Sequence, residues 1–395
     1  MKKQIILTIL SVLISNFITA QPQPFWKFKT AGKIAGSPCV SNNKIIIGSE
    51  DGFLYAIDKT NGQQLWKYQG DAPIKSTPAT VNGTVFFNNA NGNMYAIDAT
   101  SGKMLWKQQM PGEKIVDFWD YYLSSPVLHD NLVIVGSGNG AVYAFDQKTG
   151  KQVWTFKTDG VVHADPLIQN NTVYVGSFDG NFYSLNATSG QLLWKFKTVG
   201  DMFFPKGEIQ NGASFFNNTV YFGSRDFNIY ALNAEKGTGA WNMKERGSWV
   251  IATPAIADSL AFFGTSDTHT FYCLGALYSE VKWKIPLNMR VYGKAAFYEN
   301  LVLFGCFNGK LYAADKKTGT IKWEYQTEAS KQNWLTIFDE TGHIKKGFEL
   351  YGDDVHIANT EKIIMNLGSI LSSPIVEQNM VYFGSTDGYV YALKM

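Results

Sequence analysis

The sequence predicts an all-β fold: an eight-bladed β-propeller whose blades are four-stranded antiparallel sheets. A unit of about 40 residues recurs along the chain, which is a usual length for one propeller blade. The composition agrees, because 27 Phe, 20 Tyr and 37 Gly among 395 residues suit short strands joined by tight turns. The eight copies align on Gly48, Asn88, Gly136, Gly176, Gly223, Gly264, Gly305 and Gly384.

Each copy predicts four strands in the same order. In the first copy, one strand follows Pro38, since proline is tolerated at a strand start, and a second ends at Gly48. The turn Asp51-Gly52 leads to a third strand, because Asp-Gly is a strong hairpin signal. A second glycine turn leads to a fourth strand that carries Trp66. The same tryptophan position holds Trp106, Trp154, Trp194, Trp241, Trp283 and Trp323.

The two ends of the sequence complement each other. The eighth copy reaches Met395 without a fourth strand, and a matching strand with Trp26 occurs at residues 25–29. Trp26 precedes Pro38 by twelve residues, the same step that separates Trp66 from the proline of the next copy. We therefore expect the N-terminal strand to complete the last blade and hide its edge. The alternative is a truncated repeat beside an unrelated strand.

Residues 1–20 have the pattern of a signal peptide. A basic start is followed by an apolar run from Ile5 to Ile18 and by the small residue Ala20. We expect residues 21–395 to form a single propeller domain, exported to the periplasm or secreted, with no direct membrane span once the signal is removed. The alternative is an uncleaved membrane anchor. No cysteine for lipid attachment follows the apolar run, because the first one is Cys39.

Charge argues against nucleic acid as a partner. The chain has 35 basic and 33 acidic residues, and two of the basic ones lie in the expected signal peptide. A mature chain near neutrality has no overall field to attract a polyanion. The three cysteines, Cys39, Cys273 and Cys306, are too few and too scattered for a disulfide framework.

The repeat resembles the PQQ (pyrroloquinoline quinone) repeat of quinoprotein-like eight-bladed propellers. The pattern Ser-Pro, Val-Tyr-Val-Gly-Ser, Asp-Gly, Tyr-Ala-Leu-Asp, Thr-Gly and Trp, with its variants, covers nearly all of residues 25–325 and 370–395. The resemblance implies that the repeated tryptophans dock between adjacent blades. It is nearer to the non-catalytic propellers of outer-membrane assembly than to the PQQ-dependent dehydrogenases, although those assembly subunits are lipoproteins.

This resemblance implies a non-catalytic binding or scaffold protein of the cell envelope, with an envelope protein or a small polar ligand as its partner. We predict no catalytic residues, no metal and no cofactor, because the sequence lacks the adjacent cysteine pair, the haem-attachment motif and the length of the dehydrogenases. The alternative is a small PQQ-dependent dehydrogenase. In that case the quinone, with calcium, lies at the channel mouth among Asp165, Glu208, Arg290 and Lys294.

Four links between repeats are longer than the minimal connection, and all of them join the fourth strand of one blade to the first strand of the next. They therefore share one face of the disc, where repeat proteins usually place function. The longest is an insertion at about residues 326–368, for which we expect a hairpin over residues 335–350 and a short helix over residues 353–365. Aromatic residues in the links predict a partner surface, the alternative being that they pack the links onto the blades: Trp119, Tyr121, Phe203, Phe204 and Trp249.

The starts of the first strands line the central channel beside these links. Blades 4, 5 and 7 carry polar and charged residues there, which predicts a site for a polar ligand at the channel mouth: His163, Asp165, Glu208, Gln210, Arg290, Tyr292 and Lys294. Asp165 and Lys294 stand three blades apart, so we expect them to face each other across the channel without a tight ion pair. Two alternatives remain: a histidine hydrogen-bonded within the scaffold, and a channel that holds only water.

Overall fold

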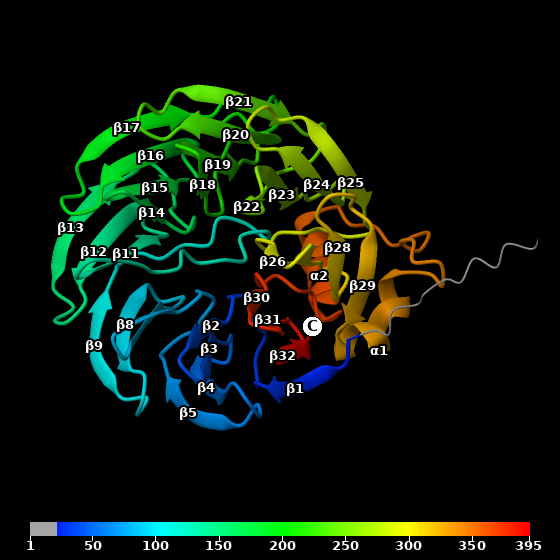
Figure 1. The fold of residues 1–395 in the computed structure, drawn as a ribbon, viewed down its shortest axis with the longest axis horizontal. Helices are drawn as coiled ribbons and strands as arrows, with labels where there is room; N and C mark the ends of the chain where they lie inside the picture. Colours follow the sequence, from blue (N-terminus) through cyan, green and yellow to red (C-terminus); the bar gives the residue numbers. More distant parts are fainter. Residues whose placement is uncertain (1–21) are drawn as a thin grey trace, which may run out of the picture.

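The computed structural model describes residues 22–395, and these form eight four-stranded antiparallel sheets in a closed ring (Figure 1). The predicted fold class is therefore confirmed. The expected signal peptide, residues 1–20, lies outside the described residues. Within the described part, neither helix is long and apolar enough to cross a membrane.

The first four blades follow the chain from its second strand onward, each running from the channel to the rim. Blade 1 comprises β2 (Cys39–Ser41), β3 (Lys44–Gly48), β4 (Phe53–Asp58) and β5 (Gln64–Gln69), and blade 2 comprises β6 (Ala79–Val81), β7 (Thr84–Asn88), β8 (Asn93–Asp98) and β9 (Met104–Gln109). Blade 3 comprises β10 (Val127–His129), β11 (Leu132–Ser137), β12 (Ala141–Asp146) and β13 (Gln152–Lys157), and blade 4 comprises β14 (Leu167–Gln169), β15 (Thr172–Gly176), β16 (Asn181–Asn186) and β17 (Leu192–Lys197).

The remaining blades continue in the same order, and the last one takes its outer strand from the start of the chain. Blade 5 comprises β18 (Ser214–Phe216), β19 (Thr219–Gly223), β20 (Asn228–Asn233) and β21 (Gly239–Lys244), and blade 6 comprises β22 (Ala255–Ala257), β23 (Leu260–Gly264), β24 (Thr270–Gly275) and β25 (Val281–Pro286). Blade 7 comprises β26 (Ala296–Tyr298), β27 (Leu301–Gly305), β28 (Lys310–Asp315) and β29 (Ile321–Gln326), and blade 8 comprises β30 (Ile375–Glu377), β31 (Met380–Gly384), β32 (Tyr389–Lys394) and β1 (Pro24–Lys29).

The middle strands and the outer strand of each blade differ in their pattern of apolar residues. The second and third strands are buried on both faces between neighbouring blades, and accordingly they are nearly continuous apolar runs, such as Ile45, Ile46 and Ile47 of β3. The fourth strands alternate between exposed and half-buried residues, as in β5 and β17. In blades 1 to 7 a register shift between the third and fourth strands marks a bulge, which increases the local twist.

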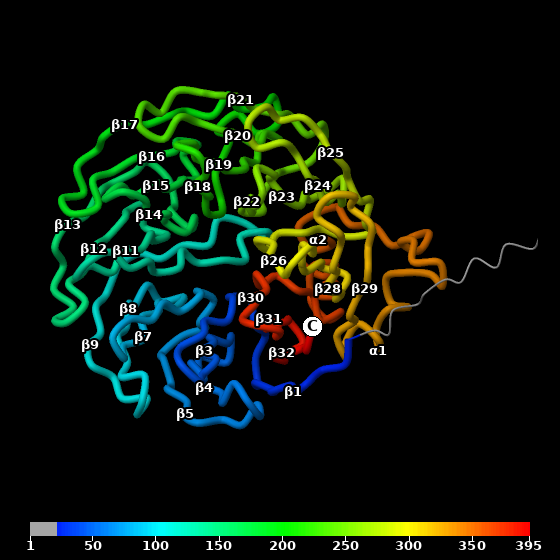
Figure 2. The backbone as a smooth tube through the Cα atoms, in the orientation of Figure 1, coloured from blue at the N-terminus to red at the C-terminus, as the bar shows by residue number. Residues whose placement is uncertain are grey.

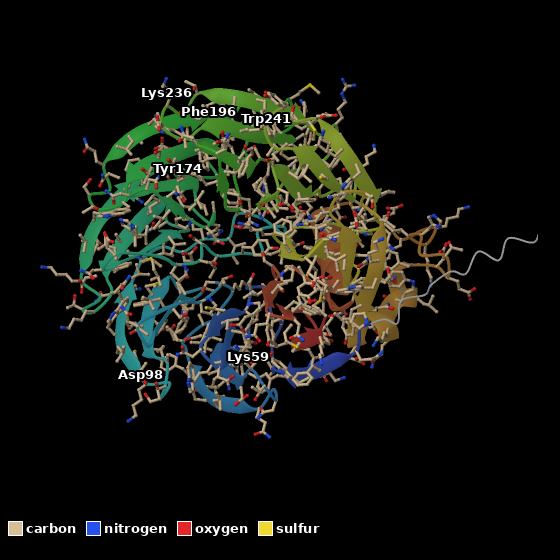
Figure 3. All side chains as sticks on the ribbon, viewed as in Figure 1. Lys59, Asp98, Tyr174, Phe196, Lys236 and Trp241 are labelled. Atoms are coloured by element: carbon tan, nitrogen blue, oxygen red, sulfur yellow. The ribbon has the colours of Figure 1, made fainter. Side chains whose placement is uncertain are left out.

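The repeated tryptophans join adjacent blades, as the family resemblance implies. The Trp106 indole N–H donates to the carbonyl of Gln147 in the next blade (2.9 Å), and Trp241, labelled in Figure 3 on the outer strand of blade 5, donates to Ala276 (3.0 Å). The rings also need glycine in the facing turn. A Cβ on Gly150, whose φ is +71°, would lie 2.7 Å from the Trp106 ring.

The ring closes where the two ends of the chain meet. β1 pairs antiparallel with β32, with Trp26 opposite Ala392, and the blue and red ends of the tube lie side by side in Figure 2. Trp26 is buried in the core between blades 8 and 1, and its indole N–H donates to the carbonyl of Lys59 (2.9 Å). The prediction that the N-terminal strand completes the last blade is confirmed, and the edge of β32 is covered.

The long link between blades 7 and 8 differs in part from the prediction. The expected short helix is present as α2 (Asp354–Met365), with the Asp353 carboxylate accepting from the His356 N–H (2.8 Å). The expected hairpin over residues 335–350 is wrong, because residues 328–337 form helix α1 (Glu328–Ile337) and only one bridge, between Phe338 and Ile344, remains. Helix-forming residues and an N-cap at Thr327 favour the helix over a strand.

Candidate functional site

The long links lie together on one face of the ring, as expected. They cover residues 110–126, 198–213, 245–254 and 327–374, and each joins an outermost strand to the innermost strand of the next blade. Turns between second and third strands end on the same face. In Figure 1 the first link, between β9 and β10, extends from its own blades toward the centre of the ring. The candidate site is therefore built from the ends of several blades.

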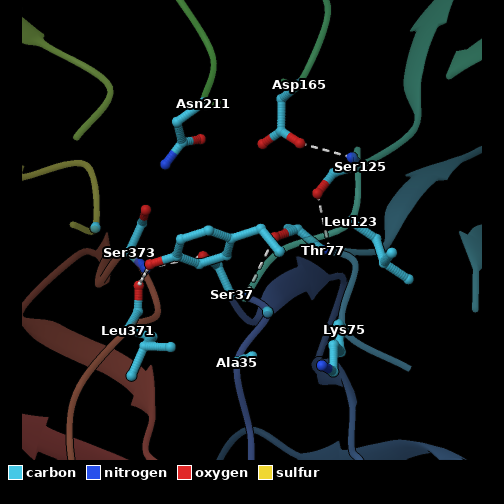
Figure 4. Close-up of a pocket in the computed structure, with 13 residues that line it drawn as sticks. Ala35, Ser37, Lys75, Thr77, Leu123, Ser125, Asp165, Asn211, Leu371 and Ser373 are labelled. Atoms are coloured by element: carbon cyan, nitrogen blue, oxygen red, sulfur yellow. Dashed lines mark hydrogen bonds between the residues drawn. The ribbon is translucent and has the colours of Figure 1, made fainter. Parts of the chain in front are cut away.

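The residues before the first strands form a chain of hydrogen bonds around the channel (Figure 4). The backbone N–H of each residue donates to the side-chain oxygen at the same position in the next blade, over 2.6–3.0 Å: Lys294 to Ser373, Ser373 to Ser37, Ser37 to Thr77, Thr77 to Ser125, and Ser125 to Asp165. This chain of hydrogen bonds ends at Asp165, because the next equivalent position is Gly212, which has no side chain to accept. Asp165 therefore accepts from Ser125, and its carboxylate takes the place that a Ser or Thr hydroxyl holds in the preceding blades.

The channel beside this chain is narrow. Tyr122 reaches across it, and its hydroxyl donates to the carbonyl of Leu371 (2.9 Å). The cavity in the channel has a volume of about 30 Å³, which is room for roughly two waters. Burial raises the pKa of Asp165 to about 6, against the lowering effects of Ser125 and Lys294, and burial lowers the pKa of Lys294. The charge of each residue acts on the pKa of the other, but no ion pair joins Asp165 to Lys294 within residues 22–395.

His163 is held between two carboxylates of the first link. Its Nδ1 lies 2.9 Å from Asp120 Oδ1, its Nε2 lies 2.7 Å from Glu113 Oε1, and its side chain is only 1% exposed. Burial by itself lowers the pKa of His163, but the hydrogen bonds and charges of Asp120 and Glu113 outweigh burial and raise it to about 9. The imidazolium therefore fastens the first link to blade 4, and both ring nitrogens are occupied.

The same link is also fastened to α2. Glu361, on α2, accepts hydrogen bonds from the indole N–H of Trp119 (3.0 Å) and from the hydroxyl of Tyr121. The opposing charge is Arg290, whose Nη1 lies 2.6 Å from Glu361 Oε1 and whose side chain is fully buried. Tyr292 is buried beside them, with its hydroxyl 2.7 Å from Ser266 Oγ. The first link is thus anchored at both sides of the channel mouth.

The seven residues predicted for the channel mouth are consequently not gathered around one cavity. Asp165 lines the channel and Lys294 starts its hydrogen-bond chain, whereas His163, Arg290 and Tyr292 are buried in the anchors of the first link. Gln210 is buried too, donating to the carbonyl of Trp119 (2.6 Å). Glu208 lies elsewhere, in a pocket between the links.

That pocket is lined by aromatic rings and charged groups. Its volume is about 490 Å³, against about 30 Å³ for the cavity in the channel. Phe204 meets Trp249 nearly at a right angle, with ring centroids 5.0 Å apart, and Trp119 meets Trp249 in the same way at 5.5 Å. We call this the aromatic pocket; its principal lining residues are Asp117, Trp119, Phe204, Glu208, Arg225, Phe227, Trp249, Asp267 and Tyr351.

One pocket residue has a strained backbone. Phe227 has a φ of +73° at a turn position that is glycine in six other blades, such as Gly52 and Gly180. A left-handed conformation costs a residue with a side chain roughly 1 to 2 kcal/mol, and such strain often marks functional sites. The strain places an aromatic ring against Phe204, with centroids 5.5 Å apart, at the rim of the aromatic pocket.

The predicted partner surface divides between two places. Trp119, Phe204 and Trp249 line the aromatic pocket, and Phe203 is 70% exposed on the link beside it. Tyr121 instead faces inward against Phe307 and Glu361. The prediction missed Arg225, Phe227, Asp267 and Tyr351. Only Phe227 had a signal in the sequence, since it replaces the glycine of the Asp-Gly turn.

The channel mouth does not fit the quinone and calcium of the alternative prediction. The first link occupies the mouth, and the space beneath it is far smaller than a tricyclic quinone. The four residues named for that site lie at three separate places. Within residues 22–395, no group of three or more His, Cys, Asp or Glu side chains is arranged to hold a metal ion.

Comparisons with known proteins agree with the repeat and the fold. A family model described as outer membrane protein assembly factor BamB matches residues 15–118, 119–242 and 204–395. A search of curated proteins by sequence finds no match. Among solved structures, BamB from Moraxella catarrhalis is similar, with a TM-score of 0.71 and 14% identity over 95% of this chain and 100% of that chain.

Dehydrogenases of the same architecture are similar to a comparable degree. The quinohemoprotein alcohol dehydrogenase ADHIIG from Pseudomonas putida HK5 has a TM-score of 0.70 and 12% identity over 94% of this chain and 76% of its own. A europium-containing methanol dehydrogenase has a TM-score of 0.70 and 14% identity over 94% and 93%. At these identities the likeness concerns the fold alone.

Proposed function

The chain belongs to the family described as outer membrane protein assembly factor BamB, and from this premise we propose that it is a non-catalytic binding propeller of the cell envelope. It acts in the periplasm or as a secreted protein, where it recruits an envelope protein through the face that carries the long links. Residues 1–20 serve as its signal peptide. N-terminal sequencing of the exported protein tests this step, and a mature chain that begins near Gln21 is the expected result.

The observation that carries the proposal is the contrast between the channel and the aromatic pocket. The channel mouth is filled by the first link, whereas the aromatic pocket beside it is open and hydrophobic. The links around the pocket add exposed apolar side chains, and apolar side chains that gather on a surface mark interaction sites. These exposed residues are Ile115, Val116, Phe118, Val199, Met202 and Phe203.

Site-specific crosslinking tests this surface. A photoreactive residue at Phe203, which is 70% exposed, should crosslink to one partner in envelope-bearing cells. The same residue at Tyr278 is the matched control, because Tyr278 is 82% exposed but lies in a turn between a third and a fourth strand, on the opposite face. Equal crosslinking from both positions, or none from Phe203, contradicts the proposed face.

A second variant separates binding from folding. Met202→Ser with Phe203→Ser removes exposed apolar surface without opening the core, so the melting temperature should change little. Loss of the crosslinked partner with an unchanged melting temperature supports the proposal.

The alternative, a PQQ-dependent dehydrogenase, is retained for test because two dehydrogenases share the fold. Incubation with PQQ and Ca²⁺, gel filtration, and an absorbance spectrum of the protein peak decide between the two. We expect no retained chromophore and no dye-linked oxidation of alcohols or sugars. A chromophore that stays with the protein and supports turnover replaces the binding role with a catalytic one.

A further inference from the structure

The aromatic pocket has a marked local charge in a chain that is otherwise near neutral. Three carboxylates line it, Asp117, Glu208 and Asp267, against the single guanidinium of Arg225. One of the carboxylate oxygens, Glu208 Oε2, is buried and has no hydrogen-bond partner anywhere in the described chain. A buried carboxylate oxygen without a partner is costly, and a positive charge bound in the adjoining pocket lowers that cost.

Arg225 does not make the pocket an anion site, because all three of its nitrogens already donate to neighbouring side chains. Its Nε and Nη2 donate to Gln210 Oε1 at 2.9 and 2.6 Å, and Nη1 is paired with Asp117. The guanidinium also lies 4.4 Å from the centre of the Trp249 ring. Two other cations lie nearby, and both are paired. Arg290, whose charge acts on Asp267, is bound to Glu361 (2.6 Å), and Lys244 is bound to Asp201 (2.6 Å).

The rings around the cavity favour the opposite charge. Trp119, Phe204, Phe227 and Trp249 stand at steep angles to one another, so that they form walls around the cavity. Aromatic faces attract cations, most strongly where water is excluded, and tryptophan is the best of them. Walls of this kind with two carboxylates in excess suit an organic cation whose charge is flanked by apolar groups.

We propose that the aromatic pocket binds an organic cation, an ammonium or guanidinium group with apolar flanks. The cation belongs either to a basic side chain of the partner or to a small alkylammonium compound. This inference rests on the proposed binding role of the same face and names the chemistry that the face recognises. Glu208 and Asp267 supply the charge, and Trp119, Phe204, Phe227 and Trp249 supply the walls.

Matched pairs of probes test the proposal on the full-length protein by calorimetry and tryptophan fluorescence. Choline is compared with 3,3-dimethylbutan-1-ol, which has the same shape without the charge. Acetyl-Gly-Arg-Gly-amide is compared with the same peptide carrying neutral citrulline. We expect at least one cation to bind about tenfold tighter than its neutral counterpart. A tighter arginine peptide assigns the cation to a partner side chain, and tighter choline assigns it to a small molecule.

Two variants locate the binding. Glu208→Gln keeps the size of the side chain and removes its charge, so the preference for the cation should fall about tenfold, whereas Glu235→Gln on the opposite face should leave it unchanged. Phe227→Gly restores the usual turn residue and should also weaken binding. Equal affinity of cation and neutral probe, or a cation preference that survives Glu208→Gln, overturns the inference. Crosslinking from Phe203 is unaffected by that outcome, so the proposed function fails or stands separately.

Discussion

His163 offers the sharpest test of how the first link closes the channel mouth. Its imidazolium joins two buried carboxylates, Glu113 and Asp120, whose side chains are 5% and 0% exposed. The substitution His163→Gln keeps a nitrogen donor and a similar size but removes the charge. Two carboxylates then share a buried site without a counter-ion, which is among the most costly arrangements in a protein interior.

The magnitude follows from the pKa. The histidine pKa is raised from 6.5 to about 9 in the folded protein, and that difference corresponds to about 3 kcal/mol of folding free energy. Because the folded pKa is the higher one, this stability is fully present below pH 6.5 and is lost as the pH rises through 9. Removing one partner of a buried pair costs about 3 to 5 kcal/mol in other proteins, which agrees.

Urea denaturation of the wild type and the variant across pH 6 to 10 is the assay. We expect His163→Gln to be less stable by about 3 kcal/mol at pH 6, and the gap to fall below about 0.5 kcal/mol at pH 10. Amide hydrogen exchange in residues 110–126 should rise in the variant at pH 6. His129→Gln is the control, since His129 is bound near the surface to Asn171.

Two results refute this reasoning. A gap of less than 1 kcal/mol at pH 6 would mean that His163 does not carry the charge that holds the link. A gap that stays constant to pH 10 would mean that the variant loses packing alone, because packing does not titrate in this range.

Three further predictions concern the scaffold. Glu361→Gln strips the counter-ion from a buried guanidinium and should lower stability by about 3 to 5 kcal/mol in urea titrations; a loss under 1 kcal/mol contradicts the anchor on α2. Gly102→Ala drives a Cβ to 2.9 Å from the Trp66 ring at a φ of +70° and should cost at least about 2 kcal/mol, whereas Gly239→Ala, with nothing within 4 Å, should be nearly neutral in the same melting assay. Deleting residues 22–29 uncovers the edge of β32 and should cause a large fall in melting temperature with aggregation by light scattering; a melt like the wild type contradicts ring closure by β1.

Much of the fold could be predicted because each copy of the repeat contains the turns and apolar runs that determine how its strands pair. Strand pairing within a blade depends on turns such as Asp51-Gly52 and on apolar runs such as residues 45–47, and both recur at fixed spacing. Closure could be predicted for the same reason, since Trp26 keeps the spacing of the other tryptophans. The shared face of the links also followed, because an outer-to-inner connection always leaves a blade at the same end.

The candidate site could be predicted only in part. Aromatic residues in the links marked Trp119, Phe204 and Trp249, which do line one pocket, but their hydrophobicity could not separate them from Tyr121, which faces inward. Phe227 was visible as an aromatic residue in a glycine position. Arg225 and Asp267 lie in turns that the repeat makes look ordinary.

The sequence by itself determined the ring: eight blades, their order, their closure and the face on which the links gather. Each of these depends on contacts between residues that are near in sequence or that recur with the repeat. Only the tertiary structure decided that the first link fills the channel mouth and leaves an aromatic pocket beside it. Those contacts join residues without counterparts in the repeat, such as Tyr121 and Glu361, 240 positions apart, and no periodic pattern encodes them.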